Sequence, residues 1–208
     1  MGLFDKFKKR NINKDGAENT TFSHFTKIFK PSNDLVKPTE EELKQFENVL
    51  PSELLNFWQE YGFGNYGDGI IKVIYPLDYM ESFYKWLGVE DFSKIPILLT
   101  SFGDIFYYRK LQEDVEDICL LSIHYRNSTV CSYSFQDFLK SYIINEEICN
   151  EVLRKKLFQK AYIEKGYLES TQIYFFVPPL VLGGKESVEL IDIGDANVHQ
   201  SLLLQLGK

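Results

Sequence analysis

The sequence predicts an α+β fold in which helices flank a central, mostly antiparallel sheet, arranged as two closely packed modules. Three observations predict this class. The first part of the chain carries apolar residues at helical spacing, the middle part has strand-like runs joined by turn residues, and the last part combines helices with two more strands. The 208 residues are 44% apolar and 15% aromatic, which is enough to fill a core and excludes a disordered or membrane-spanning chain.

The first part is expected to hold three short helices. Residues 22–29 form the first, which stops near Pro31. Thr39 and Glu42 open the second, because their spacing is that of a capping box, in which each side chain bonds an otherwise unpaired amide of the other residue. The third begins at residues 51–53. Its core-facing stripe has the spacing i, i+3, i+4 and i+7 and consists of Leu54, Phe57, Trp58 and Tyr61.

Residues 62–69 form a loop with four glycines, a composition that raises the question of phosphate binding. A phosphate loop follows a strand and precedes a helix. Here a helix precedes the loop, and the β-branched run of residues 70–75 follows it, ending at Pro76. The glycines are therefore interpreted as supplying positive φ angles in a helix-to-strand turn. A fourth helix follows, with Met80, Phe83, Tyr84 and Leu87 on one face and Gly88 at its end.

The middle of the chain changes to the period of strands. Strands are predicted over residues 95–100, 105–109, 117–124 and 129–133. The connections at residues 101–104 and 126–128 have turn chemistry, so we expect hairpins. After these strands we expect a helix that ends at residue 142 and a long helix over residues 145–165. A strand over 173–177 and another over 188–193 follow. Asp195 is expected to cap the final helix, residues 196–206.

The charge is uneven along the chain. The net charge is −7, but residues 1–14 carry five basic residues and one Asp, so the remainder is at −11. A body this acidic is a poor ligand for nucleic acid, because neutralising phosphates requires clustered Lys and Arg. It can instead meet a partner with a basic surface. The alternative is that the negative charge has no partner and only keeps the protein soluble.

The three cysteines indicate a reducing compartment. Cys119, Cys131 and Cys149 are odd in number, lack C-x-x-C spacing and lie among apolar neighbours, so we expect free, buried thiols and neither a disulfide framework nor a zinc site. The basic start is not followed by the apolar run of a secretory signal. We therefore predict a cytoplasmic protein without stable membrane association, whose residues 1–19 form a flexible basic segment.

Residues for catalysis are scarce. The best constellation is His124, Cys131 and Asp137, which a hairpin could bring together, but the local charge is not the positive one that activates a thiol. There is no G-x-S-x-G elbow. We predict no catalytic residue, no metal ligand and no cofactor.

Partner binding is a better candidate for function. The acidic loop at residues 113–117 connects two predicted strands and has no role as a helix cap. This loop is expected to be exposed, as are Tyr66 and Asp68 in the glycine loop. The predicted partner-binding residues are Tyr66, Asp68, Glu113, Asp114, Glu116 and Asp117. The alternative to partner binding by the acidic loop is that it only connects two strands of a hairpin and is solvated.

Two segments carry a family resemblance. Residues 174–184 read YFFVPPLVLGG and precede a final Leu-rich helix, which resembles the C-terminal domain of type VI secretion immunity proteins, with Pro179 in place of the usual small residue. Residues 51–62 fit P-x-x-L-x-x-x-W-x-x-Y-G, and with the strand after residues 102–104 they are similar to the GAD-like domain. That first motif also resembles a broader immunity superfamily related to yeast cell-wall regulators. Together the resemblances cover about residues 20–206, and we place the GAD-like domain at residues 20–115 and the immunity-protein domain at 116–208.

The resemblance implies a bacterial immunity protein that binds and neutralises a cognate secreted toxin. In the best-known members the toxin is a nuclease, and an acidic protein suits a DNA-binding toxin with a basic surface. The expected mechanism is non-enzymatic occlusion of the toxin's active or functional surface. The alternative is a cytoplasmic small-molecule sensor or enzyme with a pocket beside the sheet.

Overall fold

A computed structural model describes residues 20–113 and 115–206, so the predicted basic segment 1–19 lies outside the described residues. Its main sheet is antiparallel, and its strands are ordered in space as they are in the chain. The strands are β1 (Gly64–Tyr66), β2 (Ile71–Val73), β3 (Lys94–Thr100), β4 (Ile105–Gln112), β5 (Val115–Ser122) and β6 (Asn127–Ser132). A separate antiparallel pair consists of β7 (Gln172–Phe176) and β8 (Ile191–Asp195).

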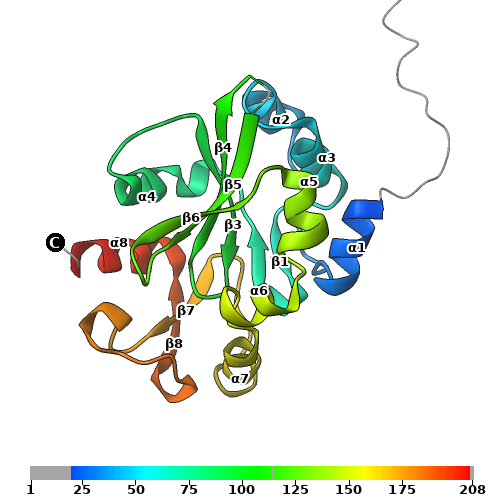
Figure 1. Cartoon of the computed structure of the whole chain (residues 1–208). Helices are drawn as coiled ribbons and strands as arrows, with labels where there is room; N and C mark the ends of the chain where they lie inside the picture. The colour runs from blue at the N-terminus through cyan, green and yellow to red at the C-terminus, as the bar shows by residue number, and fades with distance from the viewer. Residues whose placement is uncertain (1–19, 114, 207–208) are drawn as a thin grey trace, which may run out of the picture.

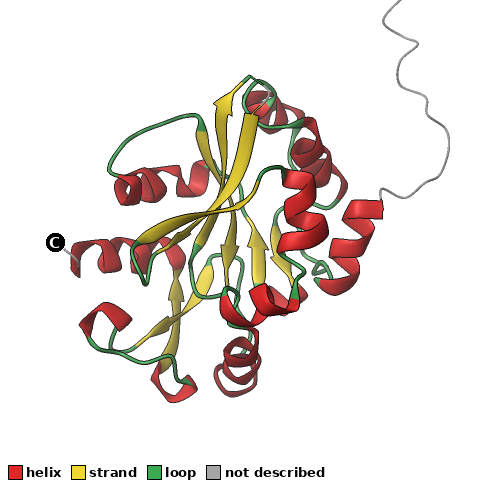
Figure 2. Ribbon diagram, viewed as in Figure 1, coloured by secondary structure: helices red, strands yellow, loops and turns green. Residues whose placement is uncertain are grey.

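Helices cover both faces of the main sheet. They are α1 (Thr20–Ile28), α2 (Glu40–Phe46), α3 (Ser52–Glu60), α4 (Leu77–Leu87), α5 (Phe135–Asp137), α6 (Glu146–Glu151), α7 (Lys155–Lys165) and α8 (Ala196–Leu206), with a π-helical turn, η3 (Phe138–Tyr142), after α5. Figure 1 shows α4 and α8 together on one side of the sheet and α1, α3 and α5 on the other. Figure 2 shows the same layers, which confirm the α+β class and the antiparallel sheet.

Local capping signals are confirmed. The Glu42 amide donates to Thr39 Oγ1 over 3.2 Å, and the Thr39 amide donates to Glu42 Oε2 over 2.7 Å, which closes the capping box of α2. Gly88 ends α4 with a φ of 70°, a conformation that favours glycine. The Val198 amide donates to Asp195 Oδ1 over 3.0 Å at the start of α8.

Three predicted elements are wrong in detail. The glycine loop contains strand β1, and the predicted strand 188–193 is a 3₁₀ turn, η5 (Val188–Leu190), followed by β8. The predicted helix 145–165 is two helices, because Arg154 between them has a φ of 51°. The side chain of Arg154 is held by Asp104 and Glu186, so tertiary ion pairs override the local helical pattern at this point.

The core is mainly aromatic and aliphatic and is continuous through both parts of the chain. Tyr66 lies inside it with 0% exposure, against Phe25 and Phe57, so the exposure expected for this residue is wrong. Cys119 and Cys149 are buried, Cys131 is half-buried and all three thiols are free. The boundary placed between residues 115 and 116 falls inside β5, which pairs with β4 in one sheet, and the division stays a prediction.

Candidate functional site

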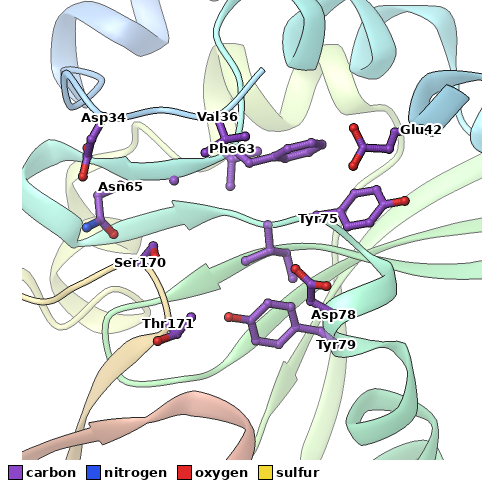
Figure 3. Close-up of a pocket in the computed structure, with 13 residues that line it drawn as sticks. Asp34, Val36, Glu42, Phe63, Asn65, Tyr75, Asp78, Tyr79, Ser170 and Thr171 are labelled. Atoms are coloured by element: carbon purple, nitrogen blue, oxygen red, sulfur yellow. The ribbon is translucent and has the colours of Figure 1, made fainter. Parts of the chain in front are cut away.

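A hollow of about 300 Å³ opens beside the first strands of the sheet, where α2, the start of α4 and the turn before β7 meet. Figure 3 shows Asp34, Asn65 and Ser170 at one end of it, and Glu42, Tyr75 and Asp78 at the other. A second hollow of about 540 Å³ continues from it and shares Asp34, Asn65 and Ser170 with it.

The two hollows together have an acidic and aromatic lining, and we call them the acidic groove. Its carboxylates are Asp34, Glu42, Asp68, Asp78 and Glu169, and its tyrosines are Tyr75, Tyr79, Tyr162 and Tyr167. Among the described residues that line it there is no Lys or Arg. The groove therefore offers negative charge and aromatic surface, and Lys72, which bonds two of its lining residues, is a buried cation that does not itself line it.

The electrostatics at one end of the groove are unfavourable in the free protein. Asp78 is exposed overall, but partial burial of its carboxyl group in the groove raises its pKa, and repulsion from Glu42 raises it further. The pKa of Tyr75 is raised by burial and by the same two carboxylates. Because like charges gather here without a compensating cation, a positive group from a partner would relieve this repulsion.

The other end remains charged. The Ser32 hydroxyl donates to Asp34 Oδ1, and this hydrogen bond holds the pKa of Asp34 below its usual value. Asp68 is exposed, has a φ of 60° and lines the second hollow.

A buried lysine fixes the floor of the groove. The ammonium group of Lys72 donates to Asn65 Oδ1 and to the Glu169 carbonyl oxygen, the latter over 2.9 Å, while Asn65 Nδ2 donates to the Leu168 carbonyl over 2.8 Å. These bonds join β1 and β2 to the segment before β7. Lys72 is only 1% exposed, and burial lowers its pKa to about 7. The chain thus rigidly positions Asn65 and Glu169, which lie far apart in sequence.

The structure brings few of the predicted partner-binding residues together. Asp68 lies in the acidic groove, whereas Tyr66 is buried below it and its hydroxyl donates to the Gly62 carbonyl over 2.7 Å. Asp114 lies outside the described residues. The remaining three belong to the β4–β5 hairpin. Two of them, Glu113 and Glu116, line a hollow that shares no lining residue with the groove.

Within that hairpin, Glu113 is exposed and Glu116 is half-buried. Asp117 is only 1% exposed, because its two carboxylate oxygens accept hydrogen bonds from Arg109 over 2.9 and 2.6 Å. The expectation of a fully exposed acidic loop is therefore wrong for Asp117, which is a structural ion-pair residue. Glu113 and Glu116 remain predicted contacts.

The candidate catalytic constellation is not assembled. His124 Nε2 bonds the Phe102 carbonyl over 2.8 Å, the Cys131 thiol is 3.7 Å from the Thr129 carbonyl, and Asp137 is exposed on α5. Burial raises the pKa of Cys131 to about 11, which disfavours the reactive thiolate. Within the described ranges, no group of three or more His, Cys, Asp or Glu residues could hold a metal ion.

Sequence reasoning missed most of the groove. Asp34, Glu42, Asp78 and Glu169 come from four separate segments, and no motif links them. Considered alone, each carboxylate has the sequence context of a residue in a chain turn or in the first turn of a helix. Only the folded arrangement places them around one hollow.

Comparison with known proteins gives the family. Residues 20–121 match the GAD-like domain, and residues 132–207 match the C-terminal domain of the type VI secretion system immunity protein Tdi1. The chain is thus a GAD-like protein with the C-terminal domain of type VI secretion immunity proteins. The acidic groove contains residues of both matched regions, since Asp34 to Tyr79 lie in the first and Tyr162 to Thr171 in the second.

A solved structure supports the fold of this immunity-family chain. The crystal structure of Atu4351 from Agrobacterium tumefaciens superposes with a TM-score of 0.67, at 18% identity and with 88% of each chain covered. No curated protein sequence matches the chain. Among the described residues, no helix is both long and apolar enough to cross a membrane.

Proposed function

We propose that this chain is a cytoplasmic immunity protein that neutralises a cognate toxin by binding it directly, without catalysis. The observation that carries the proposal is the succession of the two family domains over residues 20–121 and 132–207. The toxin is expected to present a basic surface, as a nuclease does toward DNA. Occlusion of that surface, or of the active site beside it, would block the toxin.

The acidic groove is the best candidate for the contact. Tyrosine and charged residues around a concave surface are typical of protein interfaces, and Tyr167 and Tyr162 are 67% and 39% exposed at its rim. Asp34, Asp68 and Asp78 are all exposed carboxylates that a Lys or Arg side chain could reach. This surface includes one predicted contact, Asp68, and extends it to residues that the sequence pattern did not indicate.

The decisive experiment is co-expression of this chain with the protein encoded beside its gene. Immunity by direct binding predicts that the neighbour arrests growth alone, that this chain restores growth, and that the two copurify. Toxicity without rescue, or rescue without a complex, would refute the proposed mechanism.

Three charge variants then locate the contact. Replacing Asp34, Asp68 and Asp78 by Asn should weaken the complex and reduce its dependence on salt, because each pair lost removes a screened electrostatic attraction. A matched triple variant with Glu41→Gln, Asp137→Asn and Glu146→Gln removes three exposed carboxylates outside the groove and should bind normally. A third variant, Glu113→Gln with Glu116→Gln, tests the hairpin. If only this one loses affinity, the groove is not the toxin contact.

A further inference from the structure

Two carboxylates with free oxygens lie at the end of the acidic groove beside α2 and α4. Glu42 Oε2 accepts from the Thr39 amide and hydroxyl over 2.7 and 2.9 Å, whereas Glu42 Oε1 has no hydrogen bond within the described part of the chain. The Asp78 carboxyl group has none to any described residue, and it lines the same hollow as Glu42. The pair therefore offers negative charge and acceptor atoms to a group from outside.

A third polar group points into the same space. Tyr79 is only 5% exposed, and its hydroxyl makes no hydrogen bond with a described residue. Figure 3 shows this hydroxyl pointing into the hollow that the ring lines. It is open to that space, unlike the Trp58 indole nitrogen, which is an unpaired polar atom enclosed in the core. Because burial raises the pKa of Tyr79 to about 12, the hydroxyl is neutral at physiological pH and can accept a hydrogen bond.

The ring of Tyr75 lies between the two carboxylates. Figure 3 shows Glu42 on one side of it and Asp78 on the other, and both raise the pKa of its hydroxyl. Phe46 and Phe63 hold the ring in place, with centroids 6.2 and 5.6 Å from its own. The face of a tyrosine ring attracts cations, so this half-buried ring adds a flat cation-binding surface to the acidic pair.

These features favour a planar organic cation over a metal ion or an ammonium group. The described residues include no group of three or more His, Cys, Asp or Glu that could hold a metal ion. An ammonium group is a compact charge with three donors, whereas a guanidinium group is flat, carries five N–H donors in one plane and stacks on aromatic rings. Two carboxylates, a hydroxyl acceptor and an aromatic face match the guanidinium group.

We propose that Glu42, Tyr75, Asp78 and Tyr79 form an arginine pocket, which binds the guanidinium group of one arginine side chain of the toxin. The two carboxylates and the Tyr79 hydroxyl accept its N–H groups, and the Tyr75 ring packs against its plane. The source of the arginine rests on the function proposed above, but the pocket itself can be tested without the toxin.

The first test titrates the full chain with Nα-acetyl-arginine methylamide and follows amide chemical shifts by NMR. The matched lysine derivative carries the same charge on a compact group, and the citrulline derivative has the shape of arginine without the charge. We expect the arginine derivative to bind at millimolar concentrations, about tenfold more tightly than the citrulline derivative and also more tightly than the lysine derivative. Absence of arginine binding, or equal binding of arginine and lysine, overturns the proposal.

The variant Tyr79→Phe removes only the unpaired hydroxyl. The affinity for the arginine derivative should fall about tenfold, as the loss of a hydrogen bond to a charged group predicts. Urea denaturation should show no loss of stability, because this hydroxyl bonds no described residue. Tyr84→Phe is the matched control on the same helix, since the Tyr84 hydroxyl donates to the Lys94 carbonyl over 3.1 Å and lies outside the groove. That control should lose stability and keep its arginine affinity; unchanged arginine binding in Tyr79→Phe would refute the pocket.

The variant Glu42→Gln tests the charge. Glutamine at this position still completes a capping box, so α2 should persist, and the affinity for the arginine derivative should fall about tenfold. Glu41→Gln removes an exposed carboxylate from the same helical turn outside the groove and is the matched control. Equal affinities of the two variants would contradict the proposal.

Binding of the toxin then separates this proposal from the immunity function. If the toxin's arginine occupies the pocket, Glu42→Gln and Tyr79→Phe weaken the toxin complex as well as probe binding. A toxin complex that is intact in both variants would refute the pocket as its contact and leave the immunity function standing. Probe binding by a chain that forms no toxin complex would refute the immunity function, and with it the toxin as the source of the arginine.

Discussion

Arg154 Nη1 donates to Asp104 Oδ2 over 2.7 Å, and both side chains are almost fully buried. Asp104 lies in the turn between β3 and β4, within the GAD-like region, whereas Arg154 starts α7 in the immunity-protein region. Asp104 Oδ1 also accepts from the Ser122 hydroxyl and the Ile123 amide. This ion pair therefore ties the two matched regions together through a fully hydrogen-bonded carboxylate.

Replacing Arg154 by Met should destabilise the protein strongly. Burial alone would raise the pKa of Asp104, but the attraction of Arg154 keeps it below its ordinary value, so the carboxylate is charged. Removing one partner of a buried pair leaves an uncompensated charge, and the free energy of unfolding should fall by about 3 kcal/mol or more. Urea denaturation measures the loss. The control is Lys85→Met, which breaks an exposed ion pair with Glu81 and should change stability little. Equal losses of unfolding free energy in the two variants would contradict the role of the buried pair.

Lys72 should make stability rise with pH. Its pKa is lowered by burial to about 7 in the folded protein, against 10.5 for an ordinary lysine. Between these values the unfolded chain binds a proton that the folded chain does not, so the free energy of unfolding increases as the pH increases. Urea titrations at pH 7 and pH 9 measure this slope. The Lys72→Met variant should show a smaller slope and Lys85→Met an unchanged one; a slope that persists in Lys72→Met would assign it to other groups.

Tyr66 should act on stability and not on partner affinity. Its hydroxyl donates to the Gly62 carbonyl inside the core, so Tyr66→Phe removes a buried hydrogen bond and should cost about 1 kcal/mol. Denaturant unfolding and the affinity for the partner are measured on the same variant. A loss of affinity without a loss of stability would restore Tyr66 as a contact.

The structural features that could be predicted from sequence depend on residues that are close to one another along the chain. The capping box of Thr39 and Glu42, the stop at Gly88 and the apolar stripe through Trp58 all depend on neighbours within one or two helical turns. Strands β2 to β6 of the sheet were predictable for the same reason, because they follow one another along the chain, whereas β1 lies in the segment interpreted as a glycine loop.

The residues that were mispredicted depend on distant partners. Arg154 breaks a helix because of Asp104, 50 positions away, and Tyr66 is buried because Phe25 and Phe57 pack against it from two helices. The acidic groove likewise brings Asp34 and Ser170 to one hollow, and Lys72 bonds both Asn65 and the Glu169 carbonyl beside it. Such arrangements have no linear signature, so a single sequence indicates the function class through its motifs but not the surface that performs it.

Asp78 should make partner binding depend on pH. In the free protein its pKa is raised by burial and by Glu42, so it holds a proton at higher pH than an ordinary carboxyl group. A basic group seated in the acidic groove would stabilise the charged form and lower that pKa, so binding releases a proton and the affinity should fall as the pH is lowered from neutral.

Calorimetry of toxin binding in buffers with different ionisation enthalpies counts the protons released. Asp78→Asn should reduce this number, whereas Asp137→Asn, which removes an exposed carboxyl group in the first turn of α5, should not. Equal proton release by Asp78→Asn and the unaltered chain would mean that no cation of the toxin approaches Asp78.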